Sequence, residues 1–329
     1  MFPLGHYLIP ARCIVFCLAA VLVAGMAGCR PSKPASAPAL LNPDRINGAN
    51  ALEEVRGLAA ISPRDAGTLG AQQAAEHLLK RLQTMGVQAS IDIFEDTAPG
   101  GPATFRNVNG VIPGKAGTSR QAWIVLGSHY DIKSGIAEPF AGANDSASSS
   151  GLLLELVRLI KAGEPLPCHI LVAFLDGEEC RRDYGPHDGL HGSRRLARTL
   201  KDDGRAANVR AVIILDMVGD KDLTITLPRN GTPRLMSAVF SAAEAEGVRN
   251  KFSLYRAELL DDHQPFLEAG MPAVDVIDFE YGSAPGRNDY WHTPADTMDK
   301  LSTASLTTVG RVAVRMLNDL AAESGNPDR

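Results

Sequence analysis

The sequence has little cysteine and few aromatic residues; the aromatic content is only 5%. Three of its five cysteines fall within the first 29 residues, which leaves Cys168 and Cys180 downstream. These two flank an apolar run that has the character of an extended strand, and a strand rises about 3.3 Å per residue. They would therefore lie beyond disulfide reach, and we predict no disulfide between them. Packing is the expected role of Cys180.

Several sequence motifs and charge patterns are also missing. There is no Gly-x-Ser-x-Gly elbow, which argues against a serine hydrolase of that kind. There is no Gly-x-Gly-x-x-Gly fingerprint or Walker motif either, so we expect no nucleotide cofactor. Lys and Arg are scattered and the net charge is -5, which gives no sign of nucleic-acid binding.

The N-terminal segment has the pattern of a secretory signal. Arg12 is the only charged side chain in the first 28 residues, and an apolar stretch covers residues 13–23. The sequence Met26-Ala27-Gly28-Cys29 resembles a bacterial lipobox, which implies cleavage before Cys29 and lipidation of that residue. We predict a signal peptide over 1–28, a flexible tether over 29–43 and one domain over 44–325. The protein would be lipid-anchored to the bacterial cell envelope, facing the periplasm or the exterior. A plain cleaved signal or an uncleaved anchor is the alternative.

Beyond residue 44, helical and strand patterns alternate without a long linker. Two early strands are close enough in sequence to pair antiparallel at a sheet edge. The later strands alternate with helices, which predicts an α/β fold: a mixed, mostly parallel sheet with helices on both faces. The predicted helices cover residues 51–60, 71–85, 147–161, 192–200, 234–246 and 302–322. The predicted strands cover residues 88–94, 105–112, 122–126, 170–175, 209–215 and 272–277.

Acidic residues follow the predicted strand at 170–175. The sequence Asp176-Gly177-Glu178-Glu179 places two adjacent carboxylates directly after this apolar run. In open α/β sheets, ligands bind at the carboxyl ends of the strands. The alternative is a solvent-exposed turn, which Asp-Gly often forms.

Other polar residues lie just past buried strands in the same way. His129 and Asp216 follow the predicted strands at 122–126 and 209–215, and His292 follows a third strand through a loop. Asp145 lies in a small-residue loop that opens a helix, where its alternative role is a helix N-cap. Carboxylates and imidazoles at several strand ends suit a catalytic zinc ion that needs no cysteine ligands. Consecutive residues point different ways, so one Glu of the pair can bind metal while the other transfers protons.

Five segments of the sequence resemble, in their order along the chain, the motifs of the M28 zinc aminopeptidase superfamily, and within it those of the glutaminyl-peptide cyclotransferases. The resemblance runs from about Asn47 to the C-terminal helix and implies an α/β sandwich around a mixed sheet. The five segments are Gly127-Ser128-His129-Tyr130-Asp131, Gly142-Ala143-Asn144-Asp145-Ser146-Ala147, Asp176-Gly177-Glu178-Glu179, Leu215-Asp216-Met217-Val218-Gly219 and Trp291-His292-Thr293.

The resemblance also implies roles for individual residues. Glu178 matches the proton-transfer carboxylate of the cyclotransferases. His129 and Asp216 match ligands of a second zinc in the aminopeptidases, but single-zinc cyclotransferases retain them without metal. The cofactor is therefore one zinc ion or two. The zinc ligands of the cyclotransferases match Asp145, Glu179 and His292.

Two segments favour the cyclotransferase branch, and other features depart from it. Residues 184–194 and 261–266 are similar to the branch, and Asp261 matches an Asp that aligns the proton-transfer network. Tyr184 stands where animal cyclotransferases have Trp, and Asp275 where they have His. The loop over residues 278–290 is longer here, and residues 292–300 look like the aminopeptidase ending. Two residues are expected to contact substrate, Tyr184 and, as a pocket wall, Trp291.

The implied substrates are the N-termini of peptides or proteins. In the cyclotransferase reaction, an N-terminal Gln closes on its own side chain and releases ammonia, with Glu178 moving the proton. The alternative is an aminopeptidase, in which Glu178 would activate water to hydrolyse the first peptide bond. A third reading is a surface-anchored binding protein that retains the fold without catalysis.

Overall fold

The central element is a mixed β-sheet. The computed structural model describes residues 40–115 and 122–324, and within them six strands pair in the order β1-β2-β4-β3-β5-β8. Strands β4, β3, β5 and β8 are parallel, whereas β1 and β2 pair antiparallel at one edge. The predicted sheet type is therefore confirmed. The bounds are β1 Gln88–Ala98, β2 Gly101–Ile112, β3 Trp123–His129, β4 His169–Leu175, β5 Val209–Asp216 and β8 Ala273–Ile277.

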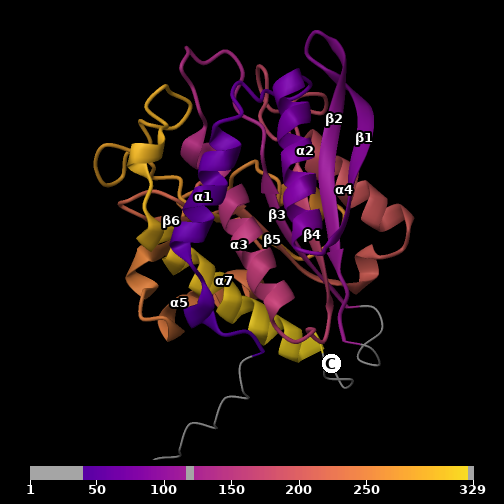
Figure 1. Ribbon diagram of the computed structural model, residues 1–329, viewed down its shortest axis with the longest axis vertical. Coiled ribbons are helices and arrows are strands. Elements are labelled where there is room, and N and C mark those ends of the chain that lie inside the picture. The colour runs from indigo at the N-terminus through magenta and orange to yellow at the C-terminus, as the bar shows by residue number, and fades with distance from the viewer. Residues whose placement is uncertain (1–39, 116–121, 325–329) are drawn as a thin grey trace, which may run out of the picture. The chain divides into compact units, whose positions relative to one another are not determined.

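Helices cover both faces of this sheet. On one face, α1, α2, α3, α5 and α7 contribute to a large apolar core, and Figure 1 shows α1, α2 and α3 on the near side of the strands. On the other face, α4 and α6 pack in a second core. The bounds are α1 Gly48–Ala59, α2 Leu69–Thr84, α3 Ser149–Ala162, α4 His191–Asp202, α5 Pro233–Ala245, α6 Gln264–Glu268 and α7 Thr303–Ser324.

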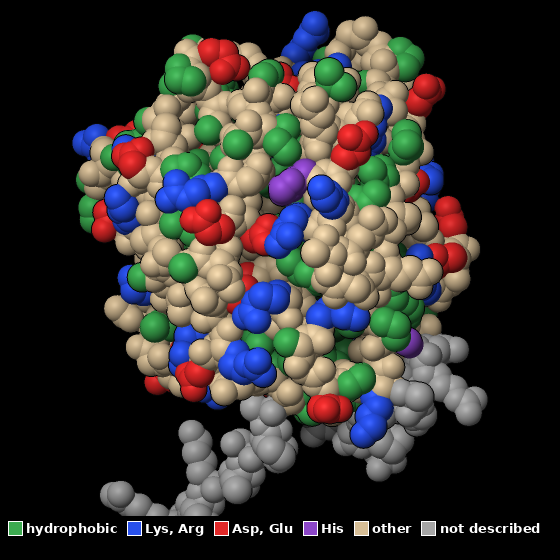
Figure 2. Space-filling model, viewed as in Figure 1, with side chains coloured by type: hydrophobic (Ala, Val, Ile, Leu, Met, Phe, Trp, Pro, Cys, Tyr) green, Lys and Arg blue, Asp and Glu red, His purple; other side chains and the backbone are tan. Residues whose placement is uncertain are grey.

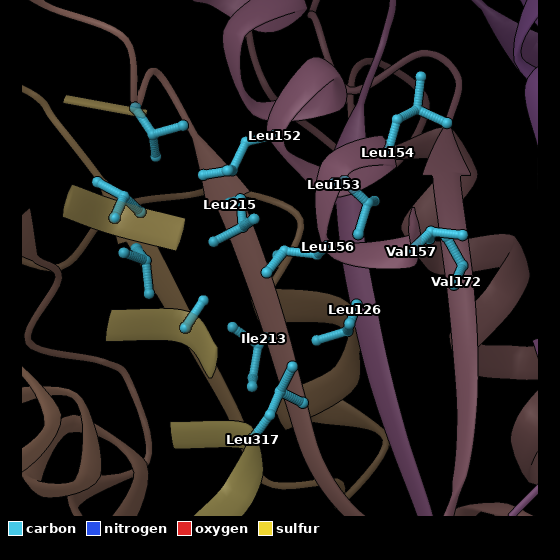
Figure 3. Packing of buried hydrophobic residues seen from close by; sticks show 14 of the residues in the cluster. Leu126, Leu152, Leu153, Leu154, Leu156, Val157, Val172, Ile213, Leu215 and Leu317 are labelled. Carbon is cyan, nitrogen blue, oxygen red and sulfur yellow. The ribbon is translucent and has the colours of Figure 1, made fainter. Parts of the chain in front are cut away.

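The strands supply both cores because successive side chains point to opposite faces. In β3, Leu126 belongs to the first core and Val125 to the second. Figure 3 shows Leu126 of β3 and Leu215 of β5 beside Leu156 of α3. Each such buried side chain contributes about 1.5–3 kcal/mol, so the parallel strands are held rigidly between two apolar layers.

Some elements differ from the sequence-based prediction. The hairpin strand β1 continues to Ala98, because a two-residue turn at Pro99 and Gly100 reverses the chain and Gly100 accepts a φ of +98°. Helix α6 and a small parallel pair, β6 Ile225–Leu227 and β7 Phe252–Leu254, were not predicted. They are too short to show a hydrophobic period in the sequence.

The folded part begins earlier than the predicted boundary at residue 44. Leu41 is buried, and its backbone exchanges two hydrogen bonds with the Asn318 side chain of α7. The end of the predicted tether is therefore packed, because an apolar Leu gains from burial against α7. The predicted signal, its Cys29 and the rest of the tether lie outside the described residues.

Two further observations concern the described residues. Cys168 and Cys180 are free thiols, as expected from their separation. None of the helices in residues 40–115 and 122–324 has the length and apolarity needed to cross a bilayer. On the face seen in Figure 2, Lys and Arg side chains lie among Asp and Glu side chains.

Candidate active site

The parallel strands deliver polar side chains to one edge of the sheet. His129 and Asp216 are the last residues of β3 and β5, and Glu178 and Glu179 follow β4 after a short turn. The helices that follow β3 and β4 pack on opposite faces, so the chain diverges at this edge. Such a divergence opens a crevice at the carboxyl ends of the strands. The sequence prediction that these residues meet there agrees with the structure.

Asp145 lies at the centre of the cluster. Its Oδ1 is 3.2 Å from His129 Nε2, and its Oδ2 is 3.3 Å from His292 Nε2. His129 Nε2 is also 3.2 Å from Asp216 Oδ1, and His292 Nε2 is 2.8 Å from Glu179 Oε1. The N-cap residues of the turn Ala143–Ser148 and of α3 are Gly142 and Ser148, so Asp145 does not take the alternative N-cap role and contacts histidines instead.

These contacts form two overlapping groups of metal-ligand atoms. In the first group, Asp145, Glu179 and His292 offer ligand atoms that all lie within 4.8 Å of one another. In the second, His129, Asp145 and Asp216 do the same. Asp145 belongs to both groups, which is the arrangement expected for a carboxylate placed between two cation positions. The residues predicted as ligands are thus brought together.

The carboxylates concentrated in this cluster shift the pKa values of the neighbouring side chains. Burial lowers the pKa of His292, but hydrogen bonds with Asp145 and Glu179 outweigh it and raise that pKa to about 9. Burial and the neighbouring Asp145 carboxylate raise the pKa of Glu179 to about 7. Without a metal, protons on the imidazoles balance the negative charge of these carboxylates. A divalent cation bound at this place would neutralise the same carboxylates.

The donor set fits zinc. Imidazole nitrogen and carboxylate oxygen are common ligands of catalytic zinc, which uses three protein ligands and one open position. Glu179 Oε2 is buried without a hydrogen-bond partner in the described chain, and its nearest cation, Lys133 Nζ, is 3.6 Å away. Cys180 is absent from both ligand groups, and its sulfur instead lies 3.0 Å from Lys133 Nζ. The three predicted ligands would hold the metal with oxygen and nitrogen donors.

Glu178 lies beside this group but makes different contacts. Its Oε1 accepts a 2.8 Å hydrogen bond from the Tyr184 hydroxyl, and it is only 5% exposed. Burial, with the nearby carboxylates of Glu179 and Asp261, raises the pKa of Glu178 well above its usual range. A carboxyl group placed beside a reacting nitrogen can accept a proton and return it. Tyr184, which was predicted to contact substrate, therefore also orients Glu178.

Two residues that position the site had no assigned role in the sequence analysis. Asp131 accepts 3.2 Å hydrogen bonds from the backbone N–H groups of Glu178 and Glu179, one on each carboxylate oxygen. Asp296 accepts hydrogen bonds from the backbone of Asn144 and Asp145, at 2.7 and 3.1 Å. Both lie inside motifs that the sequence analysis quoted, so their position there was the only signal.

Arg64 is a further positioning residue, and it had no sequence signal at all. It is fully buried, and its guanidinium donates to the carbonyl oxygens of Tyr130, Ala141 and Gly142. Arg64 therefore links the segment that follows His129 to the segment that precedes Asp145.

Asp261 and Asp275 form a buried acidic group near Glu178. Asp261 lines the same cavity as Glu178, although the described residues include no direct hydrogen bond between the two. Burial and the Asp216 and Asp262 carboxylates raise the pKa of Asp261 well above its usual range. Asp275 lies within β8, and its oxygens are buried without hydrogen-bond partners there. Asp261 therefore lies in the same cavity as Glu178, and its role in proton transfer stays a prediction.

The side chains described above line a cavity of about 250 Å³. Trp291 forms part of its wall and stacks on His292, with ring centroids 3.9 Å apart. The wall position predicted for Trp291 agrees with the structure. The cavity is lined by Asp145, Glu178, Glu179, Tyr184, Asp216, Glu258, Leu259, Leu260, Asp261, Ile277, Phe279, Trp291 and His292.

Comparison with known families decides the classification. The family model described as "Peptidase family M28" matches residues 107–317, which include every residue of the two ligand groups. The chain belongs to peptidase family M28. Enzymes of this family are zinc dependent, in agreement with the donor set of the site.

Individual relatives narrow the classification within the M28 family. The mouse (Mus musculus) glutaminyl-peptide cyclotransferase-like protein is 29% identical over 279 residues, covering 76% of this chain and 70% of that protein. The crystal structure of an Acidobacteriales bacterium glutaminyl cyclase is 32% identical with a TM-score of 0.79, covering 87% of this chain and 99% of the other. The solved structure of the Porphyromonas gingivalis glutaminyl cyclase is 28% identical with a TM-score of 0.74, covering 84% of this chain and 99% of the other. The chain therefore belongs to the glutaminyl cyclase branch of the M28 family.

Proposed function

We propose that this M28 protein is a zinc-dependent glutaminyl-peptide cyclotransferase that converts the N-terminal Gln of peptides or proteins to pyroglutamate. One observation carries the proposal: the buried carboxyl group of Glu178 lines the same small cavity as the Asp145, Glu179 and His292 ligand group. Membership in the glutaminyl cyclase branch supports the same reaction.

The reaction needs a proton to move between two nitrogens of one residue. The neutral α-amine attacks the side-chain carboxamide carbon while Glu178 accepts a proton from that attacking nitrogen. A carbon–nitrogen bond then forms within the residue, and the bond to the carboxamide nitrogen breaks. Glu178 returns the proton to that nitrogen, which leaves as ammonia. Water is not consumed.

Zinc, when bound, supplies a Lewis acid that polarises the carboxamide oxygen. The protein residues divide the other tasks. Tyr184 holds the Glu178 carboxylate by its hydrogen bond, and Asp131 holds the backbone of the Glu pair. Asp261 lines the cavity next to them and acts as the second carboxyl of the proton network. Trp291 provides an apolar wall for the substrate side chain.

A second candidate is a zinc aminopeptidase, and one observation favours it. The group formed by His129, Asp145 and Asp216 could hold a second zinc ion. In that case Glu178 would take a proton from water, which would then attack the first peptide bond.

One experiment separates the two candidate reactions. The purified fragment beginning at Arg30 is loaded with zinc and incubated with a peptide that begins with Gln and another that begins with Leu. Mass spectrometry then reads the products. Loss of ammonia from the Gln peptide, with both peptides otherwise intact, is the expected outcome. Release of a free N-terminal residue would overturn the proposal and assign His129 and Asp216 to a second zinc.

We also propose that the protein is a lipoprotein of the bacterial cell envelope, anchored through Cys29. The support is the lipobox-like sequence after an apolar stretch. In cells fed an alkyne fatty acid, the full-length protein should be labelled and should sediment with membranes, whereas the Cys29→Ser variant should not be labelled. Equal labelling of the two proteins would overturn the anchor.

A further inference from the structure

A buried carboxylate lies in the middle of β8, at a position where the fold calls for an apolar side chain. Asp275 stands between Val274 and Val276 and is completely buried. Because side chains alternate along a strand, Asp275 faces the same side as Ala273, which belongs to the apolar core beneath α4 and α6. Both carboxylate oxygens of Asp275 lack a hydrogen-bond partner among the described residues. An ionised group in such a place is costly unless another group balances its charge.

His263 lies opposite this carboxylate, in the segment before α6. Its Nδ1 is 4.0 Å from Asp275 Oδ2, and its side chain is completely buried. This distance is too long for a hydrogen bond. Neither ring nitrogen of His263 has a hydrogen-bond partner in the part of the chain that the structure describes, although buried imidazoles normally have one. The two side chains therefore leave a gap between them that a third group can bridge.

Asp261 completes the group. Asp261, His263 and Asp275 offer ligand atoms that all lie within 4.8 Å of one another, which is the same spacing that the two catalytic ligand groups meet. None of these three residues belongs to either catalytic group. Asp261 also lines the catalytic cavity, so the third group reaches inward from the cavity wall. A carboxylate has about four lone-pair positions, which allows Asp261 to serve both places.

The charge around this group is strongly negative. The neighbouring Asp262 is also completely buried. Within residues 40–115 and 122–324, no lysine or arginine forms an ion pair with Asp261, Asp262 or Asp275, and Asp275 has only the long contact with His263. Burial, together with the Asp261 and Asp216 carboxylates, raises the pKa of Asp275 well above its usual range. Either protons or a cation must therefore balance these carboxylates.

Two features favour a cation over a shared proton. A proton shared between His263 and Asp275 would need a distance shorter than 4.0 Å. Burial also lowers the pKa of His263 to about 4, so its imidazole is neutral at pH 7 and offers a lone pair. A neutral imidazole is the form that binds a metal ion.

The size of the gap and the kinds of donor atom indicate which cation fits. Zinc binds imidazole nitrogen at about 2.0–2.1 Å and carboxylate oxygen at about 2.0–2.2 Å. An ion between His263 and Asp275 can therefore reach two atoms that are 4.0 Å apart. One nitrogen and two oxygen donors suit zinc and similar divalent transition metals, whereas magnesium and calcium prefer oxygen alone.

We propose that Asp261, His263 and Asp275 form a binding site for a divalent transition-metal ion, separate from the two catalytic ligand groups. The ion balances the buried carboxylates and joins β8 to the segment before α6. It also holds the Asp261 carboxylate at the wall of the catalytic cavity. This site does not depend on the proposed reaction, because no substrate group takes part in it.

The zinc content of combined variants tests the site. Asp145 belongs to both catalytic groups, so Asp145→Ala weakens both at once. Each full-length protein is stripped with a chelator, loaded with zinc, dialysed and analysed by inductively coupled plasma mass spectrometry, and circular dichroism verifies its fold. We expect Asp145→Ala to retain about one zinc ion per chain. Addition of either Asp275→Asn or His263→Gln to Asp145→Ala should remove that ion.

The matched control is Asp278→Asn in the same Asp145→Ala background. Asp278 is completely buried three residues after Asp275, but its oxygens accept hydrogen bonds from the backbone of Thr224 and Glu280. This variant should keep the ion. Thermal unfolding provides a second readout, because an ion that binds only the folded chain stabilises it. The Tm of Asp145→Ala should rise with zinc concentration, and the Tm of the Asp275→Asn and His263→Gln combinations should not.

Three results would overturn the site. In the first, a folded Asp145→Ala protein holds no zinc, and protons then balance the buried carboxylates. In the second, zinc persists in both combined variants, so that the ion is held elsewhere, for instance by Glu179 and His292. In the third, the Asp278→Asn control loses zinc equally, so that the loss follows from any substitution of a buried acid. The proposed function stands in all three cases, since ammonia release is a separate measurement.

Discussion

The Tyr184 hydroxyl donates a 2.8 Å hydrogen bond to Oε1 of Glu178. This bond holds the carboxylate that we propose to transfer the proton.

Tyr184→Phe tests the importance of this bond. A hydrogen bond to an ionised group contributes about 1.5–3 kcal/mol, so we expect kcat to fall about tenfold or more. Zinc content should stay at the wild-type level, because Tyr184 is not among the proposed ligands. Steady-state ammonia release and metal analysis provide the two measurements. An unchanged kcat would mean that Tyr184 only lines the cavity.

The two adjacent glutamates should respond differently to substitution. Glu178→Gln removes the proton-transfer carboxylate and should lower kcat by about 10²- to 10⁴-fold with zinc still bound. Glu179→Ala and His292→Ala each remove a proposed ligand and should lose the metal. Inductively coupled plasma mass spectrometry on the dialysed proteins makes the comparison. Full zinc content in the two ligand variants would sink the ligand assignment.

Asp131→Asn should lower metal affinity or activity, although Asp131 has no proposed contact with the substrate. Each oxygen of Asp131 accepts one backbone N–H bond, from Glu178 or Glu179, and an Asn can accept only one of them. Groups that orient metal ligands typically matter by about 10- to 100-fold in activity or metal affinity, and we expect a loss of that size. A competition titration with a zinc indicator measures the affinity. Wild-type affinity together with wild-type kcat would contradict the positioning role.

Arg64→Met should destabilise the fold strongly. The guanidinium is fully buried, and its removal leaves the carbonyls of Tyr130, Ala141 and Gly142 without these donors. An unsatisfied buried polar group costs about 1–3 kcal/mol, so we expect a loss of about 3 kcal/mol or more in the free energy of unfolding. Urea unfolding gives the value. Arg56→Met is the control, because Arg56 is mostly exposed and forms an ion pair with the still more exposed Glu53, so the substitution should change stability little.

His263 should make stability depend on pH. It is completely buried, and burial lowers its pKa from 6.5 to about 4. The unfolded chain therefore takes up a proton near pH 6.5 while the folded chain resists until about pH 4. The contribution to stability is present above pH 6.5 and is lost as the pH falls through 4, amounting to about 3 kcal/mol.

The comparison variant for this effect is His263→Gln, which cannot take a proton. Urea unfolding of both proteins at pH 7, 6, 5 and 4 gives the free energy of unfolding at each pH. The wild-type value should fall more steeply with decreasing pH than that of the variant. Parallel curves would show that His263 does not titrate differently in the two states.

Much of the sheet and many of the candidate ligands could be predicted from the sequence, for a physical reason. Buried parallel strands need continuous apolar runs, and the residue after such a run stands at the carboxyl edge of the sheet. Glu178, Glu179, His129 and Asp216 could be placed together on that basis. Short elements such as α6 were not predicted, because they contain too few residues to show a hydrophobic period.

The supporting residues were harder to predict. Arg64 lies between two predicted elements and looks like an ordinary surface arginine in the sequence. Its partners are carbonyl oxygens about 70 positions away along the chain, and any residue can supply a carbonyl. Asp131 and Asp296 were visible as members of motifs, but their acceptance of backbone N–H groups depends on loop positions that no local pattern encodes.

The sequence by itself determined the order of the longer elements, the polar residues at the carboxyl edge of the parallel strands and the kinds of ligand atoms, because hydrophobic period and residue chemistry are local properties of the chain. Only the tertiary structure decided that Asp145 lies between His129 and His292, that Arg64 links the segments next to Asp145 and His129, and that His263 lies opposite Asp275. These relations depend on distances between loops from distant parts of the chain, and such distances are set by how the helices pack on both faces of the sheet.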